Sequence, residues 1–382
     1  MRIAISTGGG DAPGLNAVIR AVVLSAVQRG WTCFGVRRGY DGLYRRGGQY
    51  KFAYGAEYRG ADRRRGESEG GLLPLGPREV RGITHLGGTI LGTTNRGNPF
   101  RWPTRLEDGT IKEIDRSDEL VEALRDQGID ALVTIGGDGS LAIAHDLWKK
   151  GVPVVGVPKT IDNDVVGTEA TFGFDTAVAT ATDALDRLHT TAESHDRVFV
   201  VELMGRYAGW IALHAGLSGS ADVILIPEIP YDIAKVCDKI RAREAAGRHF
   251  SIVVVAEGAK PILGDVVVKE AKKVGTVERL GGVAAVVAGQ IAERTGKETR
   301  SLVLGHLQRG GSPTTFDRLL ALRFGSAAAR AIGDSDFGSV VVYTPPTVSR
   351  RRIADVIGRQ KLVSLDSGII LTARNLGISF GD

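Results

Sequence analysis

The sequence has few cysteines, no long apolar run and little clustered basic charge. Its two cysteines, Cys33 and Cys237, can form neither a disulfide framework nor a cysteine-ligated metal site. No run of about 18 apolar residues occurs, so we expect no membrane-spanning helix. Residues 1–7 enter a strand-like run at once, which leaves no room for a secretory signal peptide. These absences together predict a soluble protein of the cytoplasm.

The charge balance argues against a nucleic-acid partner. Lys and Arg number 49 against 44 for Asp and Glu, a formal net charge of +5. The two arginine triplets, 63–65 and 350–352, are not interleaved with the aromatic residues that nucleic-acid surfaces use. The mild positive balance favours small anionic ligands instead.

Glycine, by contrast, is abundant: 52 of 382 residues, against a usual share of about 7%. The glycines cluster at the ends of short apolar runs, which alternate with longer Ala-rich stretches of helical period. Nine runs are predicted strands: Ile3–Ser6, Cys33–Val36, Ala131–Ile135, Val154–Val157, Val198–Glu202, Val223–Ile226, Ile252–Ala256, Ser301–Leu304 and Val340–Tyr343. Seven stretches are predicted helices: Leu15–Arg29, Leu141–Lys150, Thr176–Glu193, Tyr207–Leu217, Asp232–Ala246, Val283–Arg294 and Arg318–Ile332.

This alternation predicts the fold class. Strands that are apolar on both faces and alternate with helices indicate an α/β fold of mainly parallel sheet flanked by helices. So many strands favour two sheets and therefore two lobes. The stretch Arg45–Gly82 lacks clean periodicity, and we expect a loop or small hairpin insertion there.

Ligands of open α/β sheets bind beyond the carboxyl ends of the strands, so the segments that follow the strands matter most. Residues 7–16, TGGGDAPGLN, follow the first strand; their glycines can turn backbone N–H groups toward an anion at the start of a helix near Pro13. Residues 136–140, GGDGS, offer a similar turn, with Asp138 as a Mg²⁺ ligand and Ser140 at a helix start. Alone, the first segment also fits an ordinary glycine turn, and GGDGS also occurs in NAD kinases and lipid kinases.

Residues 158–164, PKTIDND, combine two carboxylates with a hydroxyl and a cation. One carboxylate can take a proton from an attacking hydroxyl while the other contributes to a metal site, as phosphoryl transfer requires. Without context the segment also fits an Asx turn with solvated acids. Later strands end in Met204–Arg206, in Glu257–Gly258 and in residues 305–311, GHLQRGG, and Arg300 precedes the last of these; such groups suit a sugar phosphate.

In this order, GGGDAPGLN, GGTILG (87–92), GGDGS, PKTIDND, MGR and GHLQRGG closely resemble the 6-phosphofructokinase family, from Ile3 to about Phe324. The resemblance implies two domains with the active site in the cleft between them. Residues 1–172 plus 309–358 would bind the nucleotide, and residues 173–308 plus 359–382 the sugar phosphate. The implied reaction is the glycolytic transfer of a phosphoryl group from Mg-ATP to the 1-hydroxyl of fructose 6-phosphate.

The resemblance also implies roles. Asp162 is the base, Asp138 and Asp164 are the Mg²⁺ partners, and Gly10 N–H, Thr160 and Arg206 stabilise the transferred phosphoryl group. The implied nucleotide site comprises Gly10, Tyr40, Arg96, Gly137, Asp138, Gly139, Ser140 and Lys159. The implied sugar site comprises Thr160, Asp162, Asp164, Arg197, Met204, Gly205, Arg206, Glu257, Arg300, His306 and Arg309. Arg197 and Arg300 reach in from a neighbouring subunit in the family, which implies a homo-oligomer, a dimer or a tetramer.

Some positions depart from the family pattern. Lys159 is typical of pyrophosphate-dependent members, whereas Gly139 is typical of ATP-dependent ones. Leu24 and His189 stand where allosteric members carry effector-binding arginines. A pyrophosphate-dependent enzyme, a kinase of a related acceptor such as sedoheptulose 7-phosphate, and a non-catalytic sugar-phosphate sensor are the alternatives. We expect ATP as the donor, because Gly139 leaves room for the α-phosphate.

Overall fold

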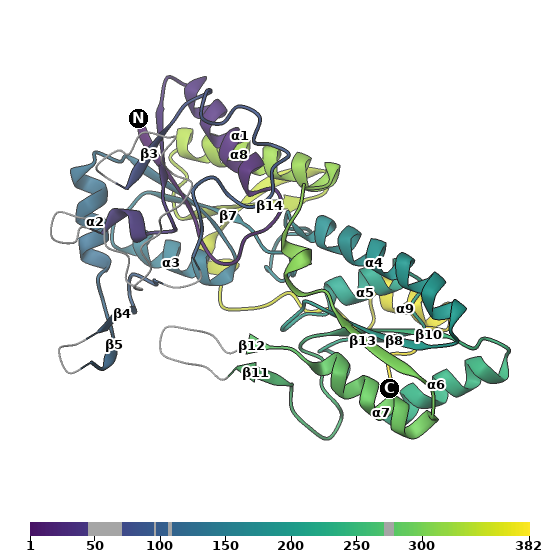
Figure 1. The fold of residues 1–382 in the computed structure, drawn as a ribbon. Helices are drawn as coiled ribbons and strands as arrows, with labels where there is room; N and C mark the ends of the chain where they lie inside the picture. The colour runs from purple at the N-terminus through teal and green to yellow at the C-terminus, as the bar shows by residue number, and fades with distance from the viewer. Residues whose placement is uncertain (45–70, 95–96, 106–108, 271–278) are drawn as a thin grey trace.

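Two lobes, each built around its own sheet, make up the structure (Figure 1). The computed structural model describes residues 1–44, 71–94, 97–105, 109–270 and 279–382. The larger sheet, in the order β15-β14-β7-β6-β1-β2-β3, comprises β1 (Arg2–Thr7), β2 (Thr32–Val36), β3 (Leu72–Leu75), β6 (Ala131–Gly136), β7 (Val154–Pro158), β14 (Ser339–Thr344) and β15 (Thr347–Arg352). The smaller sheet, in the order β13-β8-β10-β9, comprises β8 (Val198–Leu203), β9 (Val223–Leu225), β10 (Ser251–Ala256) and β13 (Thr299–Val303).

Interior strands of both sheets run parallel, which confirms the predicted fold class. The edge strands β3 and β15 pair antiparallel with β2 and β14, and neither was predicted. β15 could not be predicted because its charged residues are compatible with a strand only at the edge of a sheet. β3 lies within the stretch 45–82, so part of that stretch is sheet rather than the expected insertion, and residues 45–70 lie outside the described residues. Two hairpins, β4 (Trp102–Arg105) with β5 (Ile111–Ile114) and β11 (Val268–Glu270) with β12 (Arg279–Leu280), complete the strands described.

Helices cover both faces of each sheet, and all seven predicted helices are present. On the larger sheet, α1 (Leu15–Val27) and α8 (Thr315–Gly333) pack on one face, and α2 (Ser117–Asp126) and α3 (Asp138–Lys149) on the other. On the smaller sheet, α4 (Phe174–Ser194), α5 (Trp210–Ser218) and α9 (Gly368–Asn375) cover one face, and α6 (Ile233–Ala245) and α7 (Val283–Thr295) the other. The buried valines and isoleucines of the strands therefore have apolar partners on both sides.

The closest helix contact in the larger lobe depends on glycine. Gly325 of α8 faces α1, and a Cβ at this position would lie 2.6 Å from the carbonyl oxygen of Val18. The missing side chain lets the two helices approach closely above β1 and β6. This contact fixes the loop that joins β1 to α1, one side of the site described below.

α1 begins at the predicted residue, whereas α3 begins earlier than predicted. α1 begins at Leu15, because Gly14 adopts a left-handed conformation (φ 108°) that ends the loop one residue after Pro13. α3 begins at Asp138 rather than at Ser140. The carboxylate of Asp138 therefore lies in the first turn of the helix, close to its positive dipole end.

The chain passes between the lobes after β7, after β13 and after the 3₁₀ turn η3 (Ile353–Asp355). The predicted domain limits at residues 172, 308 and 358 fall within these three passages and stay predictions. The last passage is the yellow segment that runs from the larger lobe to the smaller one in Figure 1.

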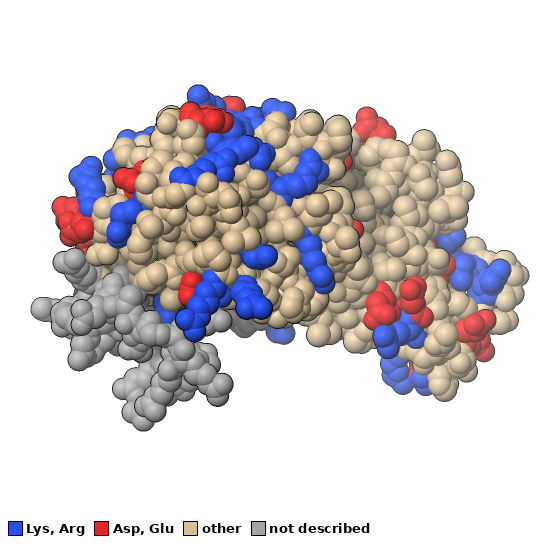
Figure 2. All heavy atoms as spheres, turned by 90° about the horizontal axis from the view of Figure 1, so that it is seen from above, with Lys and Arg blue, Asp and Glu red and all other residues tan. Residues whose placement is uncertain are grey.

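Across the described ranges, none of the helices has both the length and the apolar character needed to cross a membrane. On the face shown in Figure 2, described Lys and Arg side chains lie dispersed over the larger lobe and form no continuous stripe.

Candidate active site

The acidic segment after β7 forms a tight turn. The N–H of Asp162 donates to Thr160 Oγ1 (3.0 Å), and Thr171 Oγ1 donates to the carbonyl of Thr160 (2.7 Å). Asn163, at a left-handed φ of 52°, is buried, and its Oδ1 accepts from the N–H of Thr171 (3.2 Å). Asn163 thus holds the turn from inside, and the half-buried carboxylates of Asp162 and Asp164 flank it.

The surroundings of Asp162 suit a general base. Burial and, to a smaller extent, the charge of Asp164 raise the pKa of its carboxyl to about 6, while Arg309 and Lys159 oppose the shift. A carboxylate with this pKa is deprotonated at neutral pH and still basic enough to accept a proton. Burial also raises the pKa of Asp164, against a hydrogen bond with the Thr160 hydroxyl that lowers it.

Asp138 and Asp164 form a pair at the ends of neighbouring strands. Asp138 begins α3 directly after β6, Asp164 follows β7, and the charge of Asp138 raises the pKa of Asp164. The described residues contain no cluster of three or more His, Cys, Asp or Glu side chains that could hold a metal ion. A carboxylate pair fits Mg²⁺ nevertheless, since this ion is usually held by one or two carboxylates together with substrate phosphates and water.

The glycine loop after β1 packs against the start of α3. A Cβ at Gly8 would lie 2.6 Å from Ser140 Oγ, and one at Gly136 would lie 2.3 Å from Ser140 Cβ. Buried Lys159 reaches the same loop, where its Nζ donates to the carbonyl of Gly10. Burial and, to a smaller extent, the charge of Arg309 lower the pKa of Lys159 to about 7. The predicted phosphate-contacting residues Gly10, Ser140 and Lys159 are therefore brought together.

The first turn of α3 has room beside it. No side chain caps this helix at Gly137, so N–H groups of its first turn are available to an anion. A Cβ at Gly139 would have no neighbour within 4 Å among the described residues. Asp138 Oδ1 accepts a hydrogen bond from the N–H of Gly358 (2.8 Å), a residue of the last passage between the lobes.

Arg309 connects this site to the smaller lobe. It ends the 3₁₀ turn η2 (Gly305–Arg309), its Nη1 donates to the carbonyl of Asp11 (3.2 Å), and its charge acts on both Asp162 and Glu257. Burial raises the pKa of Glu257 to about 7, and the charges of Asp162 and Glu202 add to the shift. Glu257, at the end of β10, therefore lies in the same electrostatic environment as the predicted base.

Buried Gln308 was not among the predicted site residues, although it lies inside a motif. Its Oε1 accepts from the N–H of Met204 (3.3 Å), so it fixes the turn after β8 to η2. In that turn, Gly205 accepts from the N–H of Gly258 (3.1 Å). The guanidinium of Arg206 lies 5.1 Å from the ring centre of Tyr207. His306, at the start of η2, is exposed.

Arg197 and Arg300 lie apart from this cluster. Arg197 precedes β8 and Arg300 pairs with Phe199 in register, so both lie at the amino end of the smaller sheet. Met204 and Glu257 lie at the opposite, carboxyl end, about 20 Å away along a six-residue strand. Both arginines instead contact Glu298, at 2.9 Å and 2.5 Å.

Two further residues, Tyr40 and Arg96, were predicted to contact the nucleotide. Tyr40 is buried, and its hydroxyl lies 3.2 Å from Thr134 Oγ1 in β6; burial raises its pKa to about 12. The hydroxyl of Tyr40 is thus engaged in the core. Arg96 lies outside the described residues.

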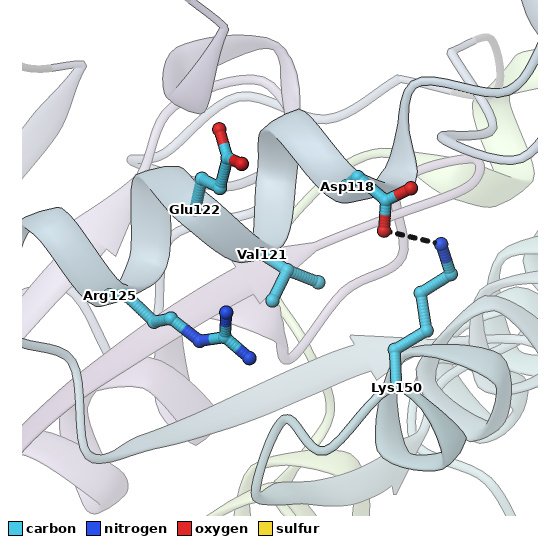
Figure 3. A pocket seen from close by; sticks show the side chains of 5 residues that line it. All are labelled: Asp118, Val121, Glu122, Arg125 and Lys150. Carbon is cyan, nitrogen blue, oxygen red and sulfur yellow. Dashed lines mark hydrogen bonds and ion pairs between the residues drawn. The ribbon is translucent and has the colours of Figure 1, made fainter.

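A separate surface hollow of about 300 Å³ lies on the outer side of α2 (Figure 3). Asp118, Val121, Glu122 and Arg125 of α2 line it, together with Lys150, whose Nζ contacts Asp118 at 2.7 Å. None of the predicted site residues lines this hollow. The acidic and phosphate-contacting residues described above lie instead at the carboxyl ends of the strands.

A backbone anion cradle, a carboxylate pair and the half-buried carboxyl of Asp162, all at the ends of parallel strands, define an α/β protein equipped to handle phosphates. A family model described as Phosphofructokinase matches residues 2–332. "ATP-dependent 6-phosphofructokinase 2" of Clostridium perfringens is 48% identical over 387 residues, covering 100% of this chain and 98% of that protein. The chain therefore belongs to the phosphofructokinase family.

Two further comparisons bear on the donor and on the fold. "Pyrophosphate--fructose 6-phosphate 1-phosphotransferase" of Streptomyces coelicolor is also 48% identical, over 95% of this chain and 96% of that protein. The crystal structure of Pichia pastoris phosphofructokinase in the T-state superposes with a TM-score of 0.72 at 31% identity, covering 93% of this chain and 35% of that one. Overall identity thus confirms the predicted family and does not discriminate between the two donors.

Proposed function

We propose that this protein transfers a phosphoryl group from ATP to the 1-hydroxyl of fructose 6-phosphate in the cytoplasm. The observation that carries the choice of ATP is the open space at Gly139, in the first turn of α3 beside Asp138. The α-phosphate and the rest of the nucleotide need passage at this place. A relative named for ATP and a relative named for pyrophosphate are both 48% identical to the chain, over 100% and 95% of its length, so the choice of donor rests on the local site.

Asp162 acts as the base. It accepts the proton of the 1-hydroxyl while that oxygen forms a bond to the γ-phosphorus, and the bond to the β,γ-bridging oxygen breaks with release of ADP. Gly10 N–H, Thr160 and Arg206 stabilise the charge on the transferred group. Asp138 and Asp164 would hold Mg²⁺, which when bound supplies charge neutralisation between the donor phosphates.

The sugar phosphate lies on the smaller-lobe side, near Met204, Glu257 and Arg309. A homo-oligomer completes the site, with Arg197 and Arg300 serving a neighbouring subunit. Two features support this assembly: both arginines lie far from the Glu257 end of the sheet, and β13 is an edge strand with exposed apolar side chains. These are Leu302, Val303 and, just beyond the strand, Leu307, with exposed fractions of 37%, 55% and 67%.

A pyrophosphate-dependent enzyme is the second candidate, because Lys159 places a buried amino group against the loop that would hold the donor phosphates. The test is a steady-state assay of the purified protein with fructose 6-phosphate and either donor, with sedoheptulose 7-phosphate as a second acceptor. We expect the highest kcat/KM with ATP and fructose 6-phosphate. A higher kcat/KM with pyrophosphate would establish the second candidate, and turnover with neither donor would refute both.

A further inference from the structure

Residues 358–363, which we call the strap, contact both residues of the predicted cation pair, Asp138 through its carboxylate and Asp164 through its backbone carbonyl. The N–H of Gly358 donates to Asp138 Oδ1 (2.8 Å), and the N–H of Lys361 donates to the carbonyl of Asp164 (2.8 Å). Between them, Gln360 forms an antiparallel bridge with Val165. Three residues of the strap, Gly358, Gln360 and Lys361, therefore contact the first turn of α3 and the acidic turn together.

Lys361 makes the densest set of these contacts. Its Nζ donates to the carbonyls of Thr168 (2.9 Å) and Glu169 (2.8 Å), at the far end of the loop that begins at Thr160. Together with the bond to Asp164, this one residue holds three backbone carbonyls of residues 164–169. The Lys361 side chain is half-buried, and its bond to Thr168, a buried residue, has less competition from water than its bond to Glu169, which is exposed.

The other side of Lys361 faces the smaller lobe. Its carbonyl accepts from Trp210 Nε1 (2.7 Å), at the start of α5, and its Nζ lies 5.5 Å from the Trp210 ring centre. Two residues further on, the N–H of Val363 donates to Glu228 Oε1 (2.9 Å), whose carboxylate also accepts from Gly209, the residue before α5. The strap is thus fastened to the smaller lobe immediately after it contacts the acidic turn.

We propose that Lys361 is a positioning residue for phosphoryl transfer: it holds the loop that carries Asp162 and Asp164 in register with α3 and ties this loop to α5 of the smaller lobe. The inference rests on the proposed function. The motif-bearing segments do not contain Lys361, which lies beyond the residues that the family model matches.

Removal of the Lys361 ammonium should therefore lower the rate of phosphoryl transfer without weakening the binding of the sugar phosphate. Without the ammonium, the carbonyls of Thr168 and Glu169 lose their donor and the loop gains freedom. Asp162 and Asp164 then move away from the position of the reacting hydroxyl. Displacement of about 1 Å at a reacting group lowers the rate by roughly 100-fold. Arg309 and Glu257 are held by other contacts, so binding of the sugar phosphate is retained.

The test compares Lys361→Met, Lys361→Arg and the control Lys239→Met. Lys239 also donates from Nζ to a backbone carbonyl, that of Gly377 (2.6 Å), but on the exposed surface of α6. For Lys361→Met we expect kcat to fall 10- to 100-fold with the KM for fructose 6-phosphate within twofold of wild type. Lys361→Arg keeps the donor and should recover much of kcat, and Lys239→Met should match wild type.

Hydrogen–deuterium exchange of the ligand-free protein provides a readout that does not depend on activity. Amides of residues 160–171 should exchange faster in Lys361→Met than in wild type or in Lys239→Met. Unchanged exchange there, or a kcat within twofold of wild type, would overturn the proposal; an inactive wild type refutes the proposed function while the exchange comparison still decides the role of the strap. If Lys361→Met does not fold, Trp210→Phe removes the bond from the smaller lobe, and the same two measurements decide.

Discussion

Arg309 lies directly over Gly10: a Cβ at Gly10 would come within 2.8 Å of Arg309 Nη1. The glycine loop of the larger lobe and Arg309, which ends η2, are therefore close neighbours. Arg309 donates to the carbonyl of Asp11, although 298 residues separate the two in the chain. The predicted donor side and acceptor side of the site are therefore joined by a hydrogen bond and by the close approach of Arg309 to the glycine loop.

The substitution Gly10→Ala tests this contact. The new methyl group should displace the guanidinium of Arg309, which is flexible enough to move, and thereby raise the KM for fructose 6-phosphate by roughly tenfold. The melting temperature should change little, because φ at Gly10 is not in the left-handed region. Gly289→Ala is the control: its Cβ meets nothing within 4 Å on α7, and it should leave KM unchanged and stabilise by about 0.5–1 kcal/mol.

Asp162→Asn keeps the shape of the side chain and removes the base. We expect kcat to fall by roughly 10²–10⁴-fold, while fructose 6-phosphate still binds in a calorimetric titration. Asp186→Asn, an exposed position on α4, is the matched control and should leave kcat unchanged. Wild-type turnover in Asp162→Asn would exclude Asp162 as the base.

The raised pKa of Asp162 also gives a signed pH dependence. The base is active only when deprotonated, so wild-type kcat/KM should fall as the pH drops through about 6. Stability runs the other way, because a carboxyl whose folded-state pKa is raised favours folding below its unfolded pKa, and this contribution is lost as the pH rises through about 6. Asp162→Asn should therefore stabilise the fold at pH 8 relative to wild type, by on the order of 1 kcal/mol, and less at pH 5. Urea unfolding at the two pH values measures the difference.

Much of this arrangement could be predicted from the sequence, and what could not has physical reasons. Strands buried on both faces, such as β6 and β10, are continuous apolar runs, and the motifs that follow them mark the strand ends. β15 could not be recognised, since three arginines are compatible with a strand only at an edge that tertiary pairing creates. α2 was not among the predicted helices, although Leu120, Val121 and Leu124, which it buries, recur at helical spacing. Lys361 belongs to none of the recognised motifs, and only the folded path of the chain brings it to the acidic turn.

Arg300→Ala tests whether sites are shared between subunits. Because Arg300 lies at the amino end of the smaller sheet, its loss should raise the KM for fructose 6-phosphate with little change in kcat, since the phosphate it would bind is remote from the bond being made. At a fructose 6-phosphate concentration near the wild-type KM, hybrid oligomers of Arg300→Ala with Asp162→Asn should be more active than either parent, because some sites then receive an intact arginine and an intact base. Hybrids that form but are only as active as the average of the two parents would place both residues in one site of one chain.

Regulation should be weak. His189 is engaged at 2.7 Å from Nε2 to the carbonyl of Gly219, and Leu24 has no charge to offer a phosphate. We expect a hyperbolic response to fructose 6-phosphate that ADP and phosphoenolpyruvate shift less than twofold. A sigmoidal response moved strongly by either ligand would contradict this and point to an effector site elsewhere.

Gly139→Asp tests the choice of donor. The site has room for the new side chain, and an acidic residue in the first turn of α3 is favourable for the helix, so the protein should fold normally. The carboxylate would occupy the passage of the α-phosphate and repel its charge, so kcat/KM for ATP should fall by roughly 10- to 100-fold, equivalent to about 1.4–2.8 kcal/mol. Gly139→Asn supplies the same shape without the charge, and Gly139→Ala only the backbone change; both should lose less. With Lys159 already present at the loop, Gly139→Asp should gain measurable turnover with pyrophosphate. ATP kinetics unchanged in Gly139→Asp would show that the nucleotide does not pass Gly139, and the open space there would no longer favour ATP over pyrophosphate.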